Sequence, residues 1–323
     1  MTALVEARGL VKHYPIRSGL FGREAGRVHA VDGVSLRVEK GETYALVGES
    51  GCGKSTTGRL LLKLEEPTAG EVLLDGKRVK RLRGKDNSGF RRRVQAVFQD
   101  PFSSLNPRLD VATIVEEGML IHGLYQRPGE RRERAAELLS LVGLSPDSLS
   151  RYPHEFSGGQ RQRIGLARAL STGPEFIVAD EAVSALDVSI QAQIINLLEE
   201  LRDRLGLAYL FIAHDLAVVR HLSHRVGVMY LGVLVEEGPA EEVFTQPLHP
   251  YTEALLSAIP DPDPKAGRKR IILAGDVPRP DHPPPGCRFH TRCPRSRPAC
   301  REGEPAVVKP SANRMVRCHF LVN

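Results

Sequence analysis

The sequence predicts an α/β fold built around a largely parallel sheet. Short apolar runs that resemble strands alternate with longer helical patterns along most of the chain. A glycine-rich loop joins one of these strands directly to a helix, as in proteins that bind phosphate groups. No comparable strand-like run occurs between Gln99 and Phe176, and roughly residues 105–170 of this stretch carry helical periodicity. This stretch predicts a helical insertion in the α/β core.

Local sequence patterns predict the individual elements. RVGVMYLGVLVEEG (225–238) predicts a hairpin that turns near Gly232. Residues 16–28 are rich in Gly and Arg and predict a loop between two early strands. YTEALLSAI (251–259) predicts a helix, and beyond it the prolines make regular structure hard to assign. The predicted strands of the core are TYALVG (43–48), RVQAVFQ (93–99), EFIVAD (175–180) and LAYLFIAHD (207–215).

The composition excludes some classes of function. The chain has 323 residues, 41% of them apolar, which is enough to bury the cores of more than one domain. It has no Trp and only 5% aromatic residues, which argues against aromatic platforms for nucleic acid. No apolar run is long enough to span a membrane, and the first residues lack the features of a signal peptide. We therefore expect a reducing compartment, where structural disulfides are rare.

The net charge of +6 is unevenly distributed. From Asp261 onward there are 13 Lys and Arg residues against 6 Asp and Glu residues. The same segment holds 11 of the 23 prolines. The excess positive charge therefore belongs to a Pro-rich C-terminal extension and not to the body of the protein.

GESGCGKST (48–56) fits the phosphate-loop pattern G-x-x-x-x-G-K-[ST] and lies between a predicted strand and a predicted helix. Glycines permit a tight loop whose N–H groups converge on phosphate oxygens. Lys54 is expected to reach the β- and γ-phosphates, and the Ser55 hydroxyl to bind Mg²⁺. Cys52 is interpreted as a small loop residue. The candidate ATP-binding residues of this loop are Gly48, Ser50, Gly51, Cys52, Gly53, Lys54, Ser55 and Thr56.

FIVADE (176–181) is an apolar strand that ends in two carboxylates. At the carboxyl edge of a sheet, Asp180 can hold Mg²⁺ through water, and Glu181 can polarise an attacking water. Taken alone, the pattern also fits a strand followed by a solvated acidic turn. The phosphate loop upstream favours the catalytic interpretation.

FSGGQRQR (156–163) resembles the signature sequence of ATP-binding-cassette (ABC) ATPases, and the other elements of that family occur in its order. Gln99 resembles the Q-loop, Asp187 in SALD (184–187) the D-loop, and His214 the switch histidine. Tyr14 stands where the family places an aromatic ring that stacks on adenine. The resemblance implies an ABC nucleotide-binding domain: a P-loop, RecA-like core with an antiparallel β subdomain and a helical subdomain. The implied boundaries are 1–104 and 171–258 for the core, 105–170 for the helical signature subdomain and 259–323 for the C-terminal extension.

The resemblance also implies how the residues would work. Two cassettes pack head to tail, and the signature of each closes over the ATP of the other. Glu181 would be the catalytic base, His214 would position water and γ-phosphate, and Gln99 would join Ser55 and Asp180 at Mg²⁺. Related cassettes usually have Pro after the catalytic Glu, whereas this chain has Ala182, and we expect activity to survive that change. The signature residues acting in trans would be Ser157, Gly158, Gly159 and Gln160.

Four longer stretches narrow the resemblance to the ATPases of oligopeptide/dipeptide importers, and within them to the F-type subunit. This resemblance implies a second, D-type cassette as heterodimer partner, two transmembrane permeases and an extracytoplasmic peptide-binding protein. It also implies a peripheral location on the cytoplasmic face of the inner membrane. The stretches are QDPFSSLNPR (99–108), RYPHEFSGGQRQRIGLARAL (151–170), DVSIQAQIINLL (187–198) and PLHPYTEALLSAIP (247–260).

Three alternatives remain open. The cargo can be another small solute, such as nickel. A soluble ABC ATPase that acts on nucleic acid would fit the basic runs at 77–85 and 90–94, but such runs are usually solvated faces. A cassette that only binds ATP is disfavoured by Glu181 and His214. We expect no nucleic-acid partner.

Four of the five cysteines gather near the C-terminus, at Cys287, Cys293, Cys300 and Cys318. Their spacing, C-x5-C-x6-C-x17-C, matches neither common zinc ribbons nor the bacterial ferredoxin pattern. Disulfides, free buried thiols, four thiolates around Zn²⁺ and a [4Fe–4S] cluster all remain possible. Resemblance to peptide-importer ATPases with a similar tail implies the [4Fe–4S] cluster. We expect this segment to lie outside the ATPase machinery, so that loss of a cysteine leaves the nucleotide contacts intact.

Overall fold

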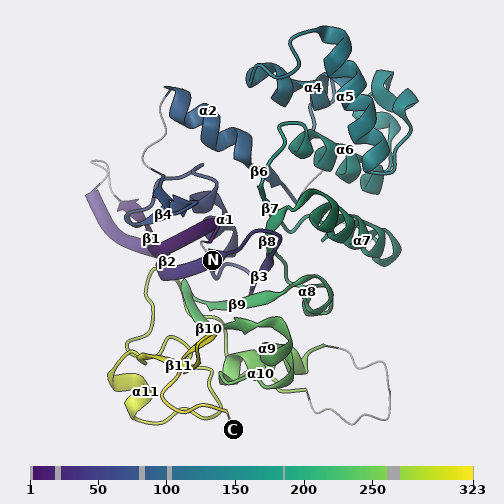
Figure 1. Cartoon of the computed structure of the whole chain (residues 1–323). Helices are drawn as coiled ribbons and strands as arrows, with labels where there is room; N and C mark the ends of the chain where they lie inside the picture. Colours follow the sequence, from purple (N-terminus) through teal and green to yellow (C-terminus); the bar gives the residue numbers. More distant parts are fainter. Residues whose placement is uncertain are drawn as a thin grey trace, which may run out of the picture. The chain divides into compact units, whose positions relative to one another are not determined.

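The computed structural model describes residues 3–18, 23–79, 84–99, 104–184, 186–259 and 270–322. The chain forms two compact units, coloured along the sequence in Figure 1. The first unit comprises Met1–Arg37, Thr43–Val79 and Ala213–Asn323, and the second comprises Val38–Glu42 and Lys80–Ile212.

The first unit contains a four-stranded sheet in the order β2-β1-β4-β5. Strands β1 and β4 are antiparallel, with Val5 opposite Leu74. The predicted loop at 16–28 is wrong for most of its length, because residues 16–18 and 23–28 belong to strands and only 19–22 lie outside the described residues. Backbone hydrogen bonds can sustain an exposed strand end without apolar side chains, so composition alone misplaced it. The strands are β1 (Val5–Ser18), β2 (Arg23–Val38), β4 (Ala69–Leu74) and β5 (Lys77–Arg78).

A second group of strands in this unit has the order β11-β12-β10-β9-β3. The predicted hairpin is confirmed, because β9 and β10 pair antiparallel around Leu231 and Gly232, which have φ angles of 45° and 84°. Two consecutive positive φ angles are typical of the tight turn that suits strand twist. The strands are β3 (Thr43–Val47), β9 (Arg225–Tyr230), β10 (Val233–Pro239), β11 (Val307–Ser311) and β12 (Arg314–Arg317).

Helices of the first unit include the one that follows the phosphate loop and the predicted helix near 251–259, which is confirmed as α10. The side chain of Asp215 caps α8 by accepting from the N–H groups of Ala217 and Val218. The helices are α1 (Lys54–Leu61), α8 (Leu216–Leu222), α9 (Ala240–Thr245), α10 (Pro250–Ser257) and α11 (Ala299–Glu302).

Residues 270–322, called the C-terminal segment below, belong to the first unit. Strand β12 pairs antiparallel with β10, placing Val316 opposite Glu236, and this segment lies beside β10 in Figure 1. Phe289 is 1% exposed and packs against two buried tyrosines. Its ring centroid lies 5.2 Å from that of Tyr230 and 5.3 Å from that of Tyr251. Burial of this aromatic ring fixes the segment to the body of the unit.

The second unit has three parallel strands, in which β7 pairs with both β6 and β8. The strands predicted there are confirmed with shorter ends, and no strand occurs between β6 and β7 in the described residues. The Asp110 side chain begins α4 by accepting from the Thr113 N–H. Helices α4, α5 and α6 pack on one another, so the stretch predicted to be helical is helical. The elements are α2 (Gly84–Arg93), β6 (Val94–Val97), α4 (Val111–Ile121), α5 (Pro128–Leu141), η1 (Pro146–Ser150), η2 (Pro153–Glu155), α6 (Gly158–Leu170), β7 (Phe176–Asp180), α7 (Val188–Leu205) and β8 (Ala208–Ile212).

No helix in the described parts of the chain is both long and apolar enough to cross a bilayer.

Candidate functional site

The phosphate loop lies between β3 and α1 in the first unit, in the strand–loop–helix arrangement that the sequence predicts. Lys54 is the first residue of α1 and is only 5% exposed. Its Nζ donates to the carbonyl oxygens of Gly48, at 2.8 Å, and Glu49, at 3.0 Å. The ammonium group is thus held over the loop, where the phosphates of a nucleotide would lie.

Two glycines of this loop cannot be replaced without displacing the backbone. Gly48 has a φ of 150°, and a Cβ there would lie 2.2 Å from the Met229 carbonyl oxygen. Gly53 has a φ of 107°, and its Cβ would lie 2.1 Å from the Ala30 carbonyl oxygen. The close approach of β2 and β9 therefore requires glycine at both ends of the loop.

Cys52 is buried, and its carbonyl accepts from the Gly232 N–H at 2.9 Å. Burial raises the pKa of its thiol, which agrees with a structural loop residue and not with a reactive thiolate. Tyr14 lies on β1 in the same unit. Its hydroxyl donates to Glu65, and burial together with that carboxylate raises the pKa of Tyr14 to about 12. The Lys12 Nζ lies 5.0 Å from the centroid of the Tyr14 ring.

The remaining sequence-predicted residues divide between the units. His214 is exposed and directly precedes the cap of α8 in the first unit. Gln99 is exposed and follows β6 in the second unit. Asp180 ends β7 there, with Glu181 immediately after it.

Glu181 has an unusual backbone conformation. Its φ of 49° lies in the left-handed region, which non-glycine residues rarely adopt. Its N–H donates to the Ile212 carbonyl at 2.9 Å, and its own carbonyl accepts from the Ser184 hydroxyl at 2.9 Å. Such strain persists where surrounding contacts hold it, and it gathers at functional sites.

The signature motif forms the N-terminus of α6. The Ser157 Oγ accepts from the Gln160 N–H at 3.3 Å, and the Gln160 Oε1 accepts from the Ser157 N–H at 3.0 Å. This reciprocal capping box fixes the first turn of the helix. Gly159 lies against α7, where a Cβ would lie 2.4 Å from the Ile190 Cγ2.

Asp187 of the D-loop caps α7 next to this motif. Its carboxylate accepts from the Ile190 N–H at 2.9 Å and from the Ser189 hydroxyl at 2.8 Å. The hydrogen bond from Ile190 lowers the pKa of Asp187. Signature and D-loop are therefore brought together, whereas Ala185 lies outside the described residues.

The four C-terminal cysteines converge, although they are spread over 32 positions. All four line one small cavity in the first unit. The Cys287 N–H donates to the Cys300 carbonyl at 2.9 Å, which holds the two halves of the segment together. No disulfide joins them, and Cys287 and Cys300 are buried. The fold therefore brings together four cysteines that are far apart in sequence.

The expected separation of this segment from the ATPase machinery is wrong. Arg292, next to Cys293, forms a bidentate ion pair with Glu49 inside the phosphate loop. The distance in sequence hid this contact, because only the tertiary fold brings residues 49 and 292 together.

Sequence reasoning also missed a polar cluster on β1 and β2. His13 and His29 lie 3.4 Å and 3.3 Å from the oxygens of Asp32, and the three ligand atoms could surround a metal ion. The guanidinium of Arg288 contacts the same carboxylate. The positive charge of Arg288 disfavours binding of a metal cation at the cluster. Its contact with Asp32 instead holds the C-terminal segment against β2.

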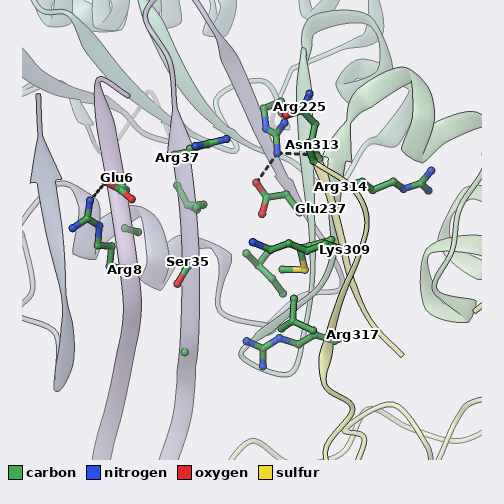
Figure 2. Close-up of a pocket in the computed structure, with 17 residues that line it drawn as sticks. Glu6, Arg8, Ser35, Arg37, Arg225, Glu237, Lys309, Asn313, Arg314 and Arg317 are labelled. Carbon is green, nitrogen blue, oxygen red and sulfur yellow. Dashed lines mark hydrogen bonds and ion pairs between the residues drawn. The ribbon is translucent and has the colours of Figure 1, made fainter. Parts of the chain in front are cut away.

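A basic pocket of about 520 Å³ lies elsewhere in the first unit, between β1–β2 and the β11–β12 hairpin (Figure 2). Three of its cations are paired: Arg8 with Glu6 at 2.6 Å, Arg225 with Glu237 at 3.0 Å and Arg314 with Glu236 at 2.7 Å. None of the site residues predicted from sequence lines it. The pocket is therefore distinct from the phosphate loop.

Comparison with known families matches two parts of the chain. Residues 31–184 match the ABC transporter family model, which covers the phosphate loop, the signature and both carboxylates. Residues 235–300 match the model of the oligopeptide/dipeptide transporter C-terminal region.

Similar proteins cover nearly the full length. The oligopeptide transport ATP-binding protein AppF of Bacillus subtilis is 53% identical over 98% of this chain and 97% of its own length. A probable peptide ABC transporter ATP-binding protein of Sinorhizobium fredii, y4tS, is 52% identical over 98% of this chain and 90% of its own.

Solved structures agree with the fold. CbiO1 of Clostridium perfringens, part of an ABC transporter complex, superposes with a TM-score of 0.66 at 27% identity, over 76% of this chain and 91% of its own. The ATP-binding cassette MJ0796, in a dimeric post-hydrolysis state with ADP and Pi, gives 0.64 at 30% identity, over 73% and 98%. On this evidence the chain belongs to the family of ATP-binding subunits of oligopeptide/dipeptide ABC transporters.

Proposed function

We propose that this chain hydrolyses ATP to drive the uptake of di- or oligopeptides across the cytoplasmic membrane. The observation that carries the proposal is full-length similarity to peptide-transport ATPases, including the C-terminal region characteristic of that group. The chain would not touch the peptide. It would convert ATP binding and hydrolysis into the closing and opening of a pair of cassettes.

The phosphate loop would bind ATP through its backbone N–H groups, the α1 N-terminus and Lys54. Tyr14 would stack on the adenine. Ser55, Gln99 and Asp180 are the residues that would hold Mg²⁺, whose charge would offset that of the β- and γ-phosphate oxygens. Serine, amide and carboxylate oxygens are the hard ligands that this ion prefers, so the donor set fits the ion.

Glu181 would take a proton from the attacking water, and His214 would orient that water and the γ-phosphate. The strained φ of Glu181 supports its assignment, because the surrounding hydrogen bonds hold this carboxylate in a conformation that costs free energy. Ala182 is 3% exposed, so the residue that replaces the usual Pro is packed and does not leave an open loop.

A second cassette would complete the site. The α6 N-terminus, with Ser157, Gly158, Gly159 and Gln160, would close over the ATP of the partner, and Asp187 would adjoin the same interface. The capping box supports this role, because it presents a pre-ordered helix end with backbone N–H groups suited to phosphate. The partner would be a D-type cassette, working with two permeases and an extracytoplasmic peptide-binding protein at the inner membrane.

The cysteine site would hold a [4Fe–4S] cluster, with Zn²⁺ as the alternative. Four sulfur ligands around one cavity suit either. The preference for the cluster over Zn²⁺ rests on the resemblance of this tail to those of peptide-importer ATPases. When bound, it would cross-link the segment that carries all four ligands.

Reconstitution of the complex tests the function. ATP-dependent accumulation of a labelled peptide in vesicles that hold the full transporter is expected, and Lys54→Ala should abolish it. Accumulation of nickel in place of peptide would favour a transporter of another small solute. Binding to nucleic acid with a steep salt dependence would favour the alternative of a soluble ABC ATPase that acts on nucleic acid. Iron and acid-labile sulfide in anaerobically purified chain would support the cluster, whereas colourless, zinc-loaded protein would refute it.

A further inference from the structure

Arg292 of the C-terminal segment reaches the phosphate loop. Its Nη1 lies 2.6 Å from the Glu49 Oε2, and its Nη2 lies 3.1 Å from the Glu49 Oε1. The side chain of Arg292 is only 8% exposed and that of Glu49 is 28% exposed. A bidentate pair of this kind, largely removed from solvent, is stronger and more directional than an exposed ion pair.

Glu49 is held at three points. Besides the ion pair, its N–H donates to the Tyr251 hydroxyl at 2.9 Å, and its carbonyl accepts from the Lys54 Nζ at 3.0 Å. One residue therefore connects the phosphate-binding lysine with the C-terminal segment. The carboxylate attracts Arg292 so strongly that the pKa of the guanidinium lies above its usual value.

The charge of Glu49 poses a problem for a loop that binds a polyanion. A carboxylate in this loop repels phosphate oxygens, and partial burial weakens the screening by water. Arg292 is the cation that neutralises it. Without Arg292, the negative charge of Glu49 would face the same loop that must accept the β- and γ-phosphates.

Several other contacts also hold the C-terminal segment in place. Phe289 is buried between aromatic rings, and Arg288 donates to Asp32 and to the Leu231 carbonyl. Arg314 is paired with buried Glu236. The segment is thus fastened at several other places, which leaves the ion pair with Glu49 available for a different role.

We propose that Arg292 is a positioning residue of the ATP site, which acts as the counter-ion of Glu49 and so makes nucleotide affinity depend on the C-terminal segment. The proposal rests on ATP binding at the phosphate loop and is independent of the transported cargo. It assigns to the segment a direct influence on the nucleotide in addition to its structural role.

The test is nucleotide binding to the full chain, measured by calorimetry for ATP, ADP and AMP. Arg292→Met should weaken ATP binding about tenfold, as expected for one uncompensated charge in a partly screened site. The loss should be smaller for ADP and smallest for AMP, because fewer phosphate charges are repelled. Adding Glu49→Gln to Arg292→Met should restore affinity, since the uncompensated charge is then gone.

Arg295→Met is the matched control. Arg295 lies three positions away and pairs, at 3.2 Å, with Glu253 of α10, which is not part of the phosphate loop. This variant should bind ATP like the unaltered chain. Equal ATP affinity in folded Arg292→Met, or a double variant as weak as the single one, would overturn the proposal. If Arg292→Met does not fold, Arg292→Lys serves as the test instead. It should weaken nucleotide binding less than Arg292→Met does, with the largest loss of affinity for ATP and the smallest for AMP. An equal loss of affinity for all three nucleotides would overturn the proposal.

Discussion

Arg314 donates from its Nη2 to the Glu236 Oε1 at 2.7 Å, and both side chains are buried, with exposures of 6% and 0%. Glu236 lies on β10 and Arg314 begins β12, so the pair joins the C-terminal hairpin to the body of the first unit. The carboxylate also accepts from the N–H groups of Leu248 and His249, at 2.9 Å each. Every oxygen of this buried acid therefore has a partner.

Arg314→Met should lower the free energy of unfolding by about 3–5 kcal/mol, because it leaves the buried Glu236 carboxylate without its counter-ion. Denaturant titration of the full chain measures the loss. The control is Arg279→Met, which removes a cation that is 81% exposed and pairs with Asp281. That substitution should not change the unfolding midpoint, and an equal effect of the two variants would contradict the structural role of the buried pair.

The contact between α6 and α7 gives a second prediction. Gly159→Ala should lower the free energy of unfolding by about 1–3 kcal/mol, because its Cβ would lie 2.4 Å from the Ile190 Cγ2. Thermal unfolding measures the change. Adding Ile190→Ala should recover part of the loss by removing the clashing group.

Gly158→Ala is the control for this experiment, because a Cβ there meets the Leu186 Cδ2 at an ordinary 3.4 Å. It should be tolerated, and helix propensity even favours it. If the two glycine variants are equally stable, the packing of α6 on α7 does not restrict this position.

Local features of the site were predictable from sequence. The strand, loop and helix around Lys54 are contiguous, and the Ser157–Gln160 capping box spans only four residues. In both cases the interacting groups are close along the chain, so their spacing determines the geometry. The roles assigned to residues that are distant in sequence but would act together in one ATP site still rest on the family resemblance.

Features of the C-terminal segment were not predictable, because they depend on long-range packing. A Pro-rich composition suggested little regular structure, yet Phe289 is buried between two tyrosines and β12 extends a sheet. The partner of Arg292 lies 243 positions away. Neither periodicity nor spacing carries information about such a contact.

Loss of a cysteine should weaken nucleotide binding through Arg292, because Arg292 directly precedes Cys293, a candidate ligand. Cys293→Ser is expected to weaken ATP binding severalfold, because a loosened segment no longer holds the guanidinium on Glu49. Calorimetry of the full chain measures the affinity. In the Arg292→Met/Glu49→Gln background the same substitution should have no further effect, and an equal loss there would show that the cysteine acts by another route.

Glu181→Gln should lower ATP hydrolysis by the assembled complex about 10²–10⁴-fold while ATP binding is retained, because the amide cannot accept a proton from water. Phosphate release measures the first quantity and nucleotide titration the second. Glu200→Gln, the same substitution at an exposed position of α7, should leave both unchanged. The left-handed backbone at position 181 is held by the Ile212 carbonyl and the Ser184 hydroxyl, so the side-chain amide should occupy the place of the carboxylate. Hydrolysis that survives Glu181→Gln would therefore remove this residue from the role of base and require another group to activate the water.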